Sequence, residues 1–324
     1  MKVIIPVAGI GTRLRPHTHT APKALLHVAG KPLLAHILDS LAEIKFDEIT
    51  FVVGFLGEQI IKYVKSSYDF NAKFVPQEKL LGLGYAIDLA IDDDETDDLL
   101  IILGDTIVET QWNEIIGKNK NFIGVQTVED PRRFGVAEVE GDKIIRLLEK
   151  PKDPPSNLAL VGVYYIKDTR EFKKSLKDIV VSNIKTKNEY QVTDAFQLML
   201  ENGCEMHTYL IEGWYDCGKL ETLLETNRHL LNKCEQCQPK IEGSVIIPPV
   251  FIADDAVIEN SIIGPYTSVA PNAKVSNSII TNSIVSYRSS VNNGLLKNSL
   301  VGIHARVEGR FNILNVGDSS EIGY

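Results

Sequence analysis

The chain has 324 residues, 44% of them hydrophobic, and a formal net charge of −9 at pH 7. This length predicts about two domains, with enough apolar residues to bury a sizeable interior. The negative charge argues against a protein that binds nucleic acid or an anionic membrane surface, because either would be repelled. A small anionic ligand is compatible with it, since such a ligand responds to the charge of its own pocket.

The N-terminal residues and the cysteines favour a cytoplasmic protein. The apolar run at residues 3–7 is too short for a signal peptide and follows a single basic residue, Lys2. No segment approaches the roughly 18 apolar residues of a membrane span. Four cysteines are few for this length. We expect Cys204 and Cys217 to be buried, which fits a reducing compartment.

Over the first hundred residues, short apolar runs alternate with helical patterns. The predicted strands are residues 3–7, 49–53, 73–75 and 99–103, and the predicted helices are residues 33–44, a segment around 60–64, and residues 85–91. A β-branched run that ends in a glycine turn, as residues 3–7 do, is typical of a buried parallel strand. This alternation predicts an open parallel sheet with right-handed crossovers.

The middle of the chain has a different pattern. Strands are predicted at residues 122–127, 135–140, 143–148 and 159–166, with Gly141 and Asp142 at a hairpin tip, and helices at residues 193–201 and 219–232. We expect these strands to form an added sheet region beside the first. Residues 1–236 are thus predicted to be one α/β domain, with a Rossmann-like, mixed but mostly parallel sheet.

A third pattern begins after Gly243. Apolar β-branched or leucine residues recur every five or six positions, separated by Asn, Ser, Gly, Ala and Pro: Ile252, Val257, Ile263, Val269, Val275, Ile280, Val285, Val291, Leu296, Val301 and Val307. Such a hexapeptide-like period predicts a short left-handed parallel β-helix over residues 244–324, of about three or four coils. A β-sandwich would show strict alternation with a period of two instead.

A glycine-containing loop follows the first predicted strand directly. It contains Ala8, Gly9, Gly11, Thr12 and Arg13, and Lys23 lies ten residues further on. Glycine allows backbone amides to approach phosphate oxygens, and the two cations could neutralise a triphosphate. A dinucleotide fingerprint would need a small residue at Leu14, and a Walker loop would need Gly-Lys-Ser/Thr. Taken alone, the loop could bind phosphate or be an ordinary strand-to-helix turn.

Further motifs follow this loop in a fixed order. They are Gln77 with Leu-Gly-Leu-Gly-Tyr-Ala at 81–86, Leu-Gly-Asp ending at Asp105, Phe-Gly-Val at 134–136, Glu-Lys-Pro at 149–151, Val-Thr-Asp at 192–194 and Trp-Tyr-Asp-Cys-Gly at 214–218. Over about residues 1–235 the chain resembles the sugar-1-phosphate nucleotidyltransferases, which join an NTP to a sugar 1-phosphate and release pyrophosphate. Long members of that family also carry a terminal β-helix.

The resemblance implies a role for each motif. Ala8, Gly9, Gly11, Thr12 and Arg13 would bind the nucleotide phosphates, and Gln77 and Gly82 the base. Gly135, Glu149, Lys150 and Thr193 would bind the sugar 1-phosphate. Asp105 and Asp216 would hold one Mg²⁺. The catalytic group would be Arg13, Lys23, Asp105 and Asp216, which align the reactants and stabilise the leaving pyrophosphate.

Two parts of the chain indicate different nucleotides. The phosphate loop, with Ala8, resembles that of uridylyltransferases, whereas residues 131–136 resemble long-form glucose-1-phosphate thymidylyltransferases. Thr106 stands where the thymidylyltransferases often have Asn. Both dTTP and UTP therefore stay open, and glucose 1-phosphate is the sugar phosphate that these motifs most often imply.

The sequence also allows other functions, which its motifs support less well. A catalytically inactive nucleotide-sugar-binding module would keep the fold, but the intact set of charged motif residues argues against it. A β-helical acyltransferase would have only His304 as a base within the coils. The single pair Cys234 and Cys237 lacks the second pair that a zinc site needs. The small-molecule substrates are the expected partners, together with further copies of the chain, because flat β-helix faces favour a homo-oligomer.

Overall fold

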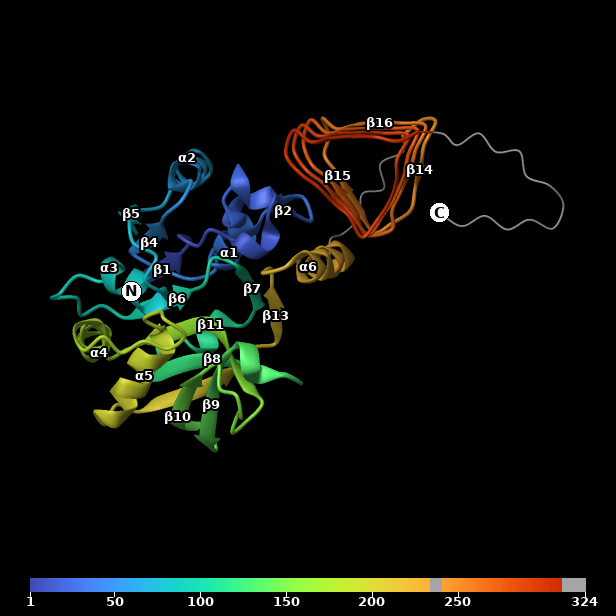
Figure 1. Ribbon diagram of the computed structural model, residues 1–324. Helices are drawn as coiled ribbons and strands as arrows, with labels where there is room; N and C mark the ends of the chain where they lie inside the picture. Colours follow the sequence, from blue (N-terminus) through green and yellow to red (C-terminus); the bar gives the residue numbers. More distant parts are fainter. Residues whose placement is uncertain (234–240, 311–324) are drawn as a thin grey trace. The chain divides into compact units, whose positions relative to one another are not determined.

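The computed structural model describes residues 1–233 and 241–310 and divides the chain into two compact units (Figure 1). The first unit comprises Met1–Leu26 and Pro32–Thr222. The second comprises His27–Lys31 and the described residues from Leu223 onward. The Cys234 and Cys237 pair lies outside the described residues. Among the helices of the described ranges, none has both the length and the apolar character that crossing a membrane would require.

A nine-stranded sheet forms the centre of the first unit, in the order β5-β4-β1-β6-β11-β8-β12-β10-β9. Strands β10 and β11 run antiparallel to their neighbours, and the other strands share one direction. The bounds are β1 (Lys2–Pro6), β4 (Glu48–Val53), β5 (Ala72–Pro76), β6 (Leu99–Ile102), β8 (Asn121–Thr127), β9 (Gly135–Glu140), β10 (Lys143–Glu149), β11 (Leu158–Ile166) and β12 (Met206–Leu210). The predicted α/β, Rossmann-like domain is confirmed.

Successive residues of the central strands pack into two different hydrophobic clusters. Ile4 on β1 belongs to one cluster, whereas Val3 and Ile5 belong to the other. The first cluster includes side chains of α3 (Leu83–Ala90), α4 (Thr169–Val181) and α5 (Val192–Glu201), and the second those of α1 (Leu33–Ser40) and α2 (Gly57–Ser67). Because a strand points alternate side chains to opposite faces, both faces of the sheet need helices to cover them.

Some elements differ from those the sequence predicts. Helix α1 ends at Ser40 rather than near residue 44, because the amides of Ala42 and Ile44 bond to carbonyls three residues back and so form turns. The middle strands extend the first sheet and do not form a separate one. Helix α4 and strand β12 were not predicted. Cys217 is buried as expected, and Cys204 is half-buried.

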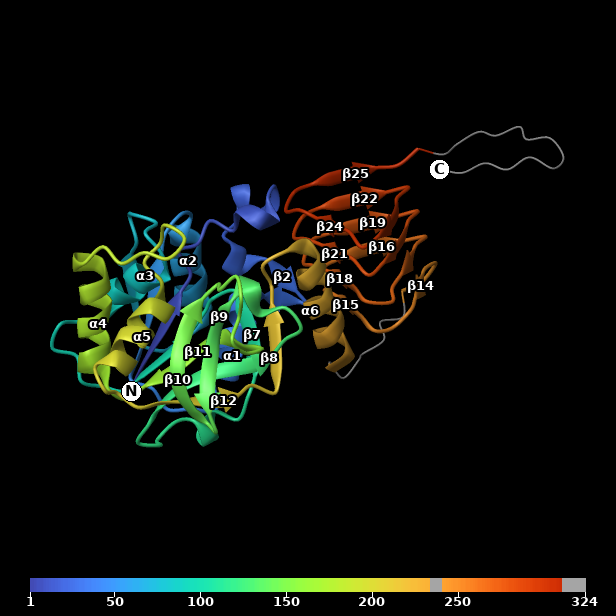
Figure 2. The same ribbon diagram turned by 60° about the horizontal axis from the view of Figure 1, so that its bottom comes forward.

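The second unit contains a stack of short parallel strands on three faces, here called the C-terminal stack (Figures 1 and 2). The first face holds β14 (Val245–Ile246), β17 (Ile262–Ile263), β20 (Ile279–Thr281) and β23 (Leu295–Lys297). The second holds β15 (Val250–Ile252), β18 (Thr267–Val269), β21 (Ile284–Val285) and β24 (Leu300–Val301), and the third β16 (Val257–Glu259), β19 (Lys274–Ser276), β22 (Ser290–Asn292) and β25 (Arg306–Glu308).

One cluster of inward side chains fills the C-terminal stack. Ile263, Val275 and Val285 are buried there together with other residues of the predicted period. The prediction was wrong at one position, since Ile258 points inward and Val257 is 42% exposed. With one inward residue per short strand, the period of five or six residues places a side chain on each face in turn.

The first prediction concerns Gly162 on β11, where the backbone has a φ of +83° and an added Cβ would lie 2.6 Å from the Leu103 side chain. Gly203 has a similar φ of +88° but open space around it. Alanine at both sites suffers the same backbone strain, but only Gly162→Ala must also displace Leu103. We expect Gly162→Ala to lower the free energy of unfolding by about 1–3 kcal/mol more than Gly203→Ala, measured by urea denaturation. Equal losses would refute this packing constraint.

Candidate active site

A cavity of about 500 Å³ lies where β1 and β6 end. The carboxyl ends of parallel strands meet there, which is where open α/β sheets bind ligands. All nine of the predicted loop, base and strand-end residues line it: Ala8, Gly9, Gly11, Thr12, Arg13, Lys23, Gln77, Gly82 and Asp105. The loop turns sharply at Gly11, which has a φ of +67° and whose carbonyl accepts the Thr18 hydroxyl at 2.8 Å. Segments distant in sequence thus enclose one space beside the phosphate loop.

The two predicted metal-binding carboxylates are brought together by a separate pair of strands. Strand β7 (Thr106–Glu109) pairs antiparallel with β13 (Gly213–Asp216), and Asp216 lies opposite Thr106 in the ladder. The backbone N–H of Cys217 also donates to the carbonyl of Asp105 at 3.1 Å. Asp105 and Asp216 therefore both line a second cavity, although more than a hundred residues separate them in the sequence.

Lys23 forms a close ion pair with Asp105. Its Nζ lies 2.6 Å from Asp105 Oδ2, and its side chain is only 10% exposed. Burial disfavours the charged form of Asp105, but the charge and hydrogen bond of Lys23, with the charge of Arg13, outweigh burial and lower the pKa of Asp105. Asp105 is therefore ionised at neutral pH.

A second cavity, of about 280 Å³, shares Arg13 and Asp105 with the first. Lys150 and Asp216 also line it, together with two aromatic residues, Phe134 and Trp214. Those two rings meet edge to face with centroids 4.9 Å apart. A ligand with an apolar ring face and an anionic end would find both kinds of contact here.

The other predicted sugar-site residues form a network behind Lys150. Thr193 Oγ1 donates to Glu149 Oε2 at 2.7 Å, and Lys150 Nζ lies 3.0 Å from Glu149 Oε1. A Cβ on Gly135 would lie 2.9 Å from the Thr193 hydroxyl, so the absence of a side chain there leaves room for the pair. Burial raises the pKa of the nearby Asp194, and the charge of Glu149 adds to the effect.

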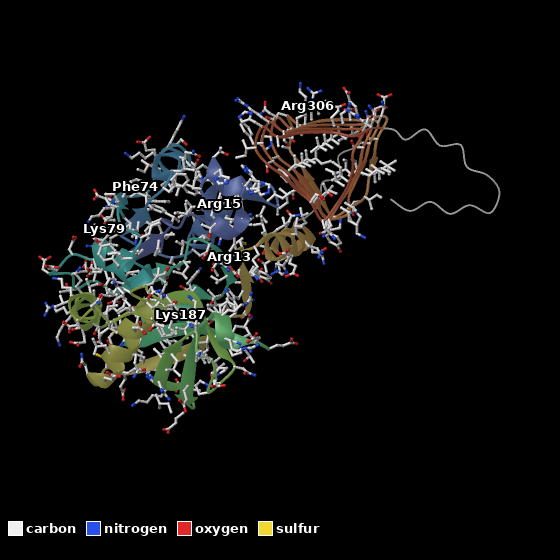
Figure 3. The ribbon with its side chains drawn as sticks, in the orientation of Figure 1. Arg13, Arg15, Phe74, Lys79, Lys187 and Arg306 are labelled. Atoms are coloured by element: carbon white, nitrogen blue, oxygen red, sulfur yellow. The ribbon has the colours of Figure 1, made fainter. Side chains whose placement is uncertain are left out.

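Several cations near the site were not predicted. A cavity of about 640 Å³ is lined by Arg13 and Lys150 and also by Asp130, Arg132, Arg133, Pro151, Lys152 and Lys187. Figure 3 labels Arg13 and Lys187, which lie far apart in the sequence but line this same cavity. Arg132 is already bound to Asp130, with nitrogen–oxygen distances of 2.7 and 2.9 Å. Arg132 and Arg133 precede the Phe-Gly-Val motif, which could have signalled them, but nothing in the sequence around Lys187 indicates a site.

The donor set of Asp105 and Asp216 suits a hard divalent cation. Magnesium prefers oxygen ligands and usually completes its shell with water and substrate phosphates rather than with a full protein cage. Two carboxylates beside a phosphate loop meet that description. Over residues 1–233 and 241–310, no group of three or more His, Cys, Asp or Glu side chains is placed to bind a metal without such outside ligands.

The glycine-containing loop, the paired carboxylates and two cavities that share Arg13 would suit an enzyme that binds a nucleotide together with a second, phosphate-bearing substrate. The chain belongs to the nucleotidyl transferase family, which it matches over residues 2–233. The resemblance to sugar-1-phosphate nucleotidyltransferases is thereby confirmed, and nucleotidyl transfer to a sugar 1-phosphate is the activity of this group. Enzymes of this family generally use a divalent metal.

Three known proteins illustrate the similarity. A glucose-1-phosphate thymidylyltransferase of Streptomyces antibioticus is 33% identical over 255 residues, covering 76% of this chain and 69% of that protein. The bifunctional protein GlmU of Methanococcus maripaludis is 38% identical over 264 residues, covering 80% of this chain but only 62% of its own length. The structure of a UDP-glucose pyrophosphorylase with UDP-glucose has 25% identity and a TM-score of 0.63, and covers 72% of this chain and 99% of that one.

The second prediction follows from the lowered pKa of Asp105. A carboxylate of this kind stabilises the fold fully above its unfolded pKa, about 3.9, and that stabilisation is lost as the pH falls through the lowered pKa. Below about pH 4, the free energy of unfolding should therefore fall more steeply in the wild type than in Asp105→Asn, as measured by urea titrations at successive pH values. Asp92→Asn, which removes an exposed carboxylate paired with Lys73, serves as control. Parallel curves for wild type and Asp105→Asn would contradict the prediction.

Proposed function

We propose that this protein transfers a nucleotidyl group from dTTP or UTP to glucose 1-phosphate, with Mg²⁺, and releases pyrophosphate. The observation that carries the proposal is the sharing of Arg13 and Asp105 between the two cavities. A group placed between two substrates can act on the atoms that react. The shared residues would lie where the two substrates meet.

The reaction needs alignment and charge neutralisation more than proton transfer. An oxygen of the sugar phosphate, already anionic, attacks the α-phosphorus of the NTP. The new P–O bond forms as the bond between that phosphorus and the oxygen bridging to the β-phosphate breaks, and pyrophosphate leaves with the electron pair. Arg13 and Lys23 would stabilise the developing charge, and Lys150 would orient the sugar phosphate. Mg²⁺ bound by Asp105 and Asp216 would supply further neutralisation of the phosphates.

Base recognition is assigned to the buried amide of Gln77. Its Nε2 donates to the Gly82 carbonyl at 3.4 Å, and its Oε1 is the atom that would accept the imide N–H of uracil or thymine. Thymine differs from uracil only by the 5-methyl group. The choice between dTTP and UTP would then depend on apolar contacts, for which Leu80 and Leu83 line the same cavity.

A substrate panel tests this function directly. We expect pyrophosphate release when dTTP or UTP is paired with glucose 1-phosphate, and less with the mannose, galactose or N-acetylglucosamine 1-phosphates or with ATP and GTP. Tight binding of a nucleotide sugar without any turnover would support an inactive binding module instead. Thiol release from acetyl-coenzyme A would support an acyltransferase.

The third prediction isolates the contribution of Asp105. Asp105→Asn keeps the size of the side chain but removes the charge that pairs with Lys23 and would bind Mg²⁺. We expect kcat to fall by at least about a hundredfold at saturating Mg²⁺, comparable to the loss of one electrostatic stabiliser. Asp92→Asn again serves as control, because it also removes a carboxylate paired with a lysine but lies away from both cavities. Turnover near that of the wild type in Asp105→Asn would refute the assignment.

The C-terminal stack is proposed to be a left-handed β-helix that joins copies of the chain. Its first face carries a row of outward aliphatic residues in consecutive strands: Val245, Ile262, Ile279 and Leu295. Val245, Ile279 and Leu295 are 55%, 45% and 80% exposed, respectively. By contrast, Lys274 and Arg306 are exposed on the third face. A two-fold contact would set this row against the same row of a second copy, so that apolar residues meet apolar residues.

The fourth prediction tests self-association through that row. Charges at Ile279→Lys and Leu295→Lys together should convert an oligomer to single chains, because buried like charges would face one another. Light scattering after size exclusion measures the mass. Leu210→Lys, which places the same charge at a 63% exposed leucine of the first unit, should leave the mass unchanged. A wild type that is already a single chain would overturn the idea.

A further inference from the structure

The segment His27–Lys31 belongs to the second unit although the chain on both sides of it belongs to the first. It forms most of a small hairpin made of β2 (His27–Val28) and β3 (Lys31–Pro32). At the tip, the backbone N–H of Ala29 donates to Asn227 Oδ1 at 2.9 Å. Asn227 lies on α6 (Leu220–Lys233) and is 0% exposed. A buried side chain of the C-terminal unit therefore holds the tip of an N-terminal hairpin.

The amide of Asn227 is also bonded to the C-terminal stack. Its Oδ1 accepts a second hydrogen bond, from Ser268 Oγ at 2.7 Å, and its Nδ2 donates to the carbonyl of Tyr266 at 3.2 Å. Because the oxygen accepts from two donors and the nitrogen donates to a carbonyl, turning the amide over would break all three hydrogen bonds. Replacing it with an apolar side chain would leave the buried N–H of Ala29 without this partner.

A second contact holds the hairpin beside Ala29. Gly30 has a φ of +98°, and an added Cβ would lie 2.5 Å from the ring of Phe251 on β15. The glycine is thus packed face-on against an aromatic ring of the C-terminal stack. The tip is held by a hydrogen bond on one residue and by close packing on the next.

A short stretch of chain with two backbone hydrogen bonds joins the hairpin to Lys23. Lys23 begins a 3-10 helix, Lys23–Leu25, and the Leu26 amide donates to the Lys23 carbonyl at 3.0 Å. The Leu33 amide donates to the Leu26 carbonyl at 3.0 Å and closes the base of the hairpin. These two bonds both involve Leu26, so they link the base of the hairpin to the turn that begins at Lys23.

We infer that Asn227 is a positioning residue for Lys23, because its side chain bonds to the tip of the hairpin that follows Lys23 in the chain. The inference rests on the proposed function only in assigning Lys23 to the triphosphate. Charge-assisted contacts depend steeply on placement, and a displacement of about 1 Å can cost up to a hundredfold in rate. The sugar phosphate is bound by residues outside this hairpin and should be little affected.

The test compares three variants of the full chain. Asn227→Leu removes all polar atoms at similar volume. Asn227→Asp keeps an oxygen for the Ala29 N–H, and Ser268→Ala removes a donor to that oxygen while leaving the Ala29 bond. We expect Asn227→Leu to raise the KM and the calorimetric Kd for dTTP or UTP about tenfold, with the KM for glucose 1-phosphate changed by less than about twofold. Asn227→Asp and Ser268→Ala should stay within about threefold of the wild type.

A double-mutant cycle asks whether the effect passes through Lys23. In a Lys23→Met background, Asn227→Leu should cause no further loss of nucleotide affinity, because the group it positions has been removed. Hydrogen exchange of the amides of residues 23–31 should be at least about tenfold faster in Asn227→Leu than in Asn227→Asp. Losses that multiply in the double variant, or equal losses for both substrates, would show a general structural role and overturn the inference.

Two further outcomes are covered by the design. If Asn227→Leu does not fold, Gly30→Ala displaces the same tip through Phe251 and should give the same selective loss for the nucleotide; nucleotide affinity equal to that of the wild type would overturn the inference. If the wild type binds dTTP or UTP but releases no pyrophosphate, the proposed function fails while calorimetry still tests the positioning. The two failures are therefore distinguishable.

Discussion

Two carboxylates that face the same cavity repel each other unless positive charge lies beside them. Asp105 and Asp216 are held in that arrangement by the pairing of β7 with β13, and Lys23 Nζ lies 2.6 Å from Asp105. Without the lysine, burial would push Asp105 toward its neutral form and deprive the cavity of a hard oxygen ligand. The path of the phosphate loop, which returns Lys23 to the end of β6, is the solution that the fold provides.

The two cavities of the site share charged residues at their boundary. Arg13 and Asp105 line both cavities, whereas Gln77 lines one and Lys150 the other. A reaction between two anionic substrates must overcome their mutual repulsion before any bond forms. Cations and carboxylates at the shared boundary are suited to that task, since Arg13 and a metal held by Asp105 would neutralise both substrates where they meet.

Much of the sheet could be predicted because its central strands are continuous apolar runs buried on both faces, as Val3, Ile4 and Ile5 are. Strand β12 lies at 206–210, where Met-His-Thr-Tyr-Leu has neither an apolar run nor clean alternation, so pairing with β8 determines it. Strand β12 therefore depends on tertiary contacts that a local pattern does not contain. Helix α4 is different, because its buried Phe172, Leu176 and Ile179 recur at helical spacing among polar residues. That helix could have been predicted from the local pattern and was missed.

The site shows the same division between local and long-range information. Motif order predicted Arg13, Gln77 and Asp105, and these residues line one cavity. Lys187, by contrast, lies in a loop with a φ of +56° and no periodic pattern. The tie between Thr193 and Glu149 spans 44 residues and becomes visible only when β10 and α5 are placed.

The hairpin at residues 27–31 extends this reasoning to the C-terminal stack. A polar side chain with no exposed surface, such as Asn227, is costly to bury and is retained where its partners are fixed in space. Here those partners are the hairpin amide of Ala29 and two groups of the stack, at Tyr266 and Ser268. The hairpin begins at His27, four residues after Lys23. Under the inference drawn above, the buried amide of Asn227 fixes this hairpin and thereby helps to position Lys23.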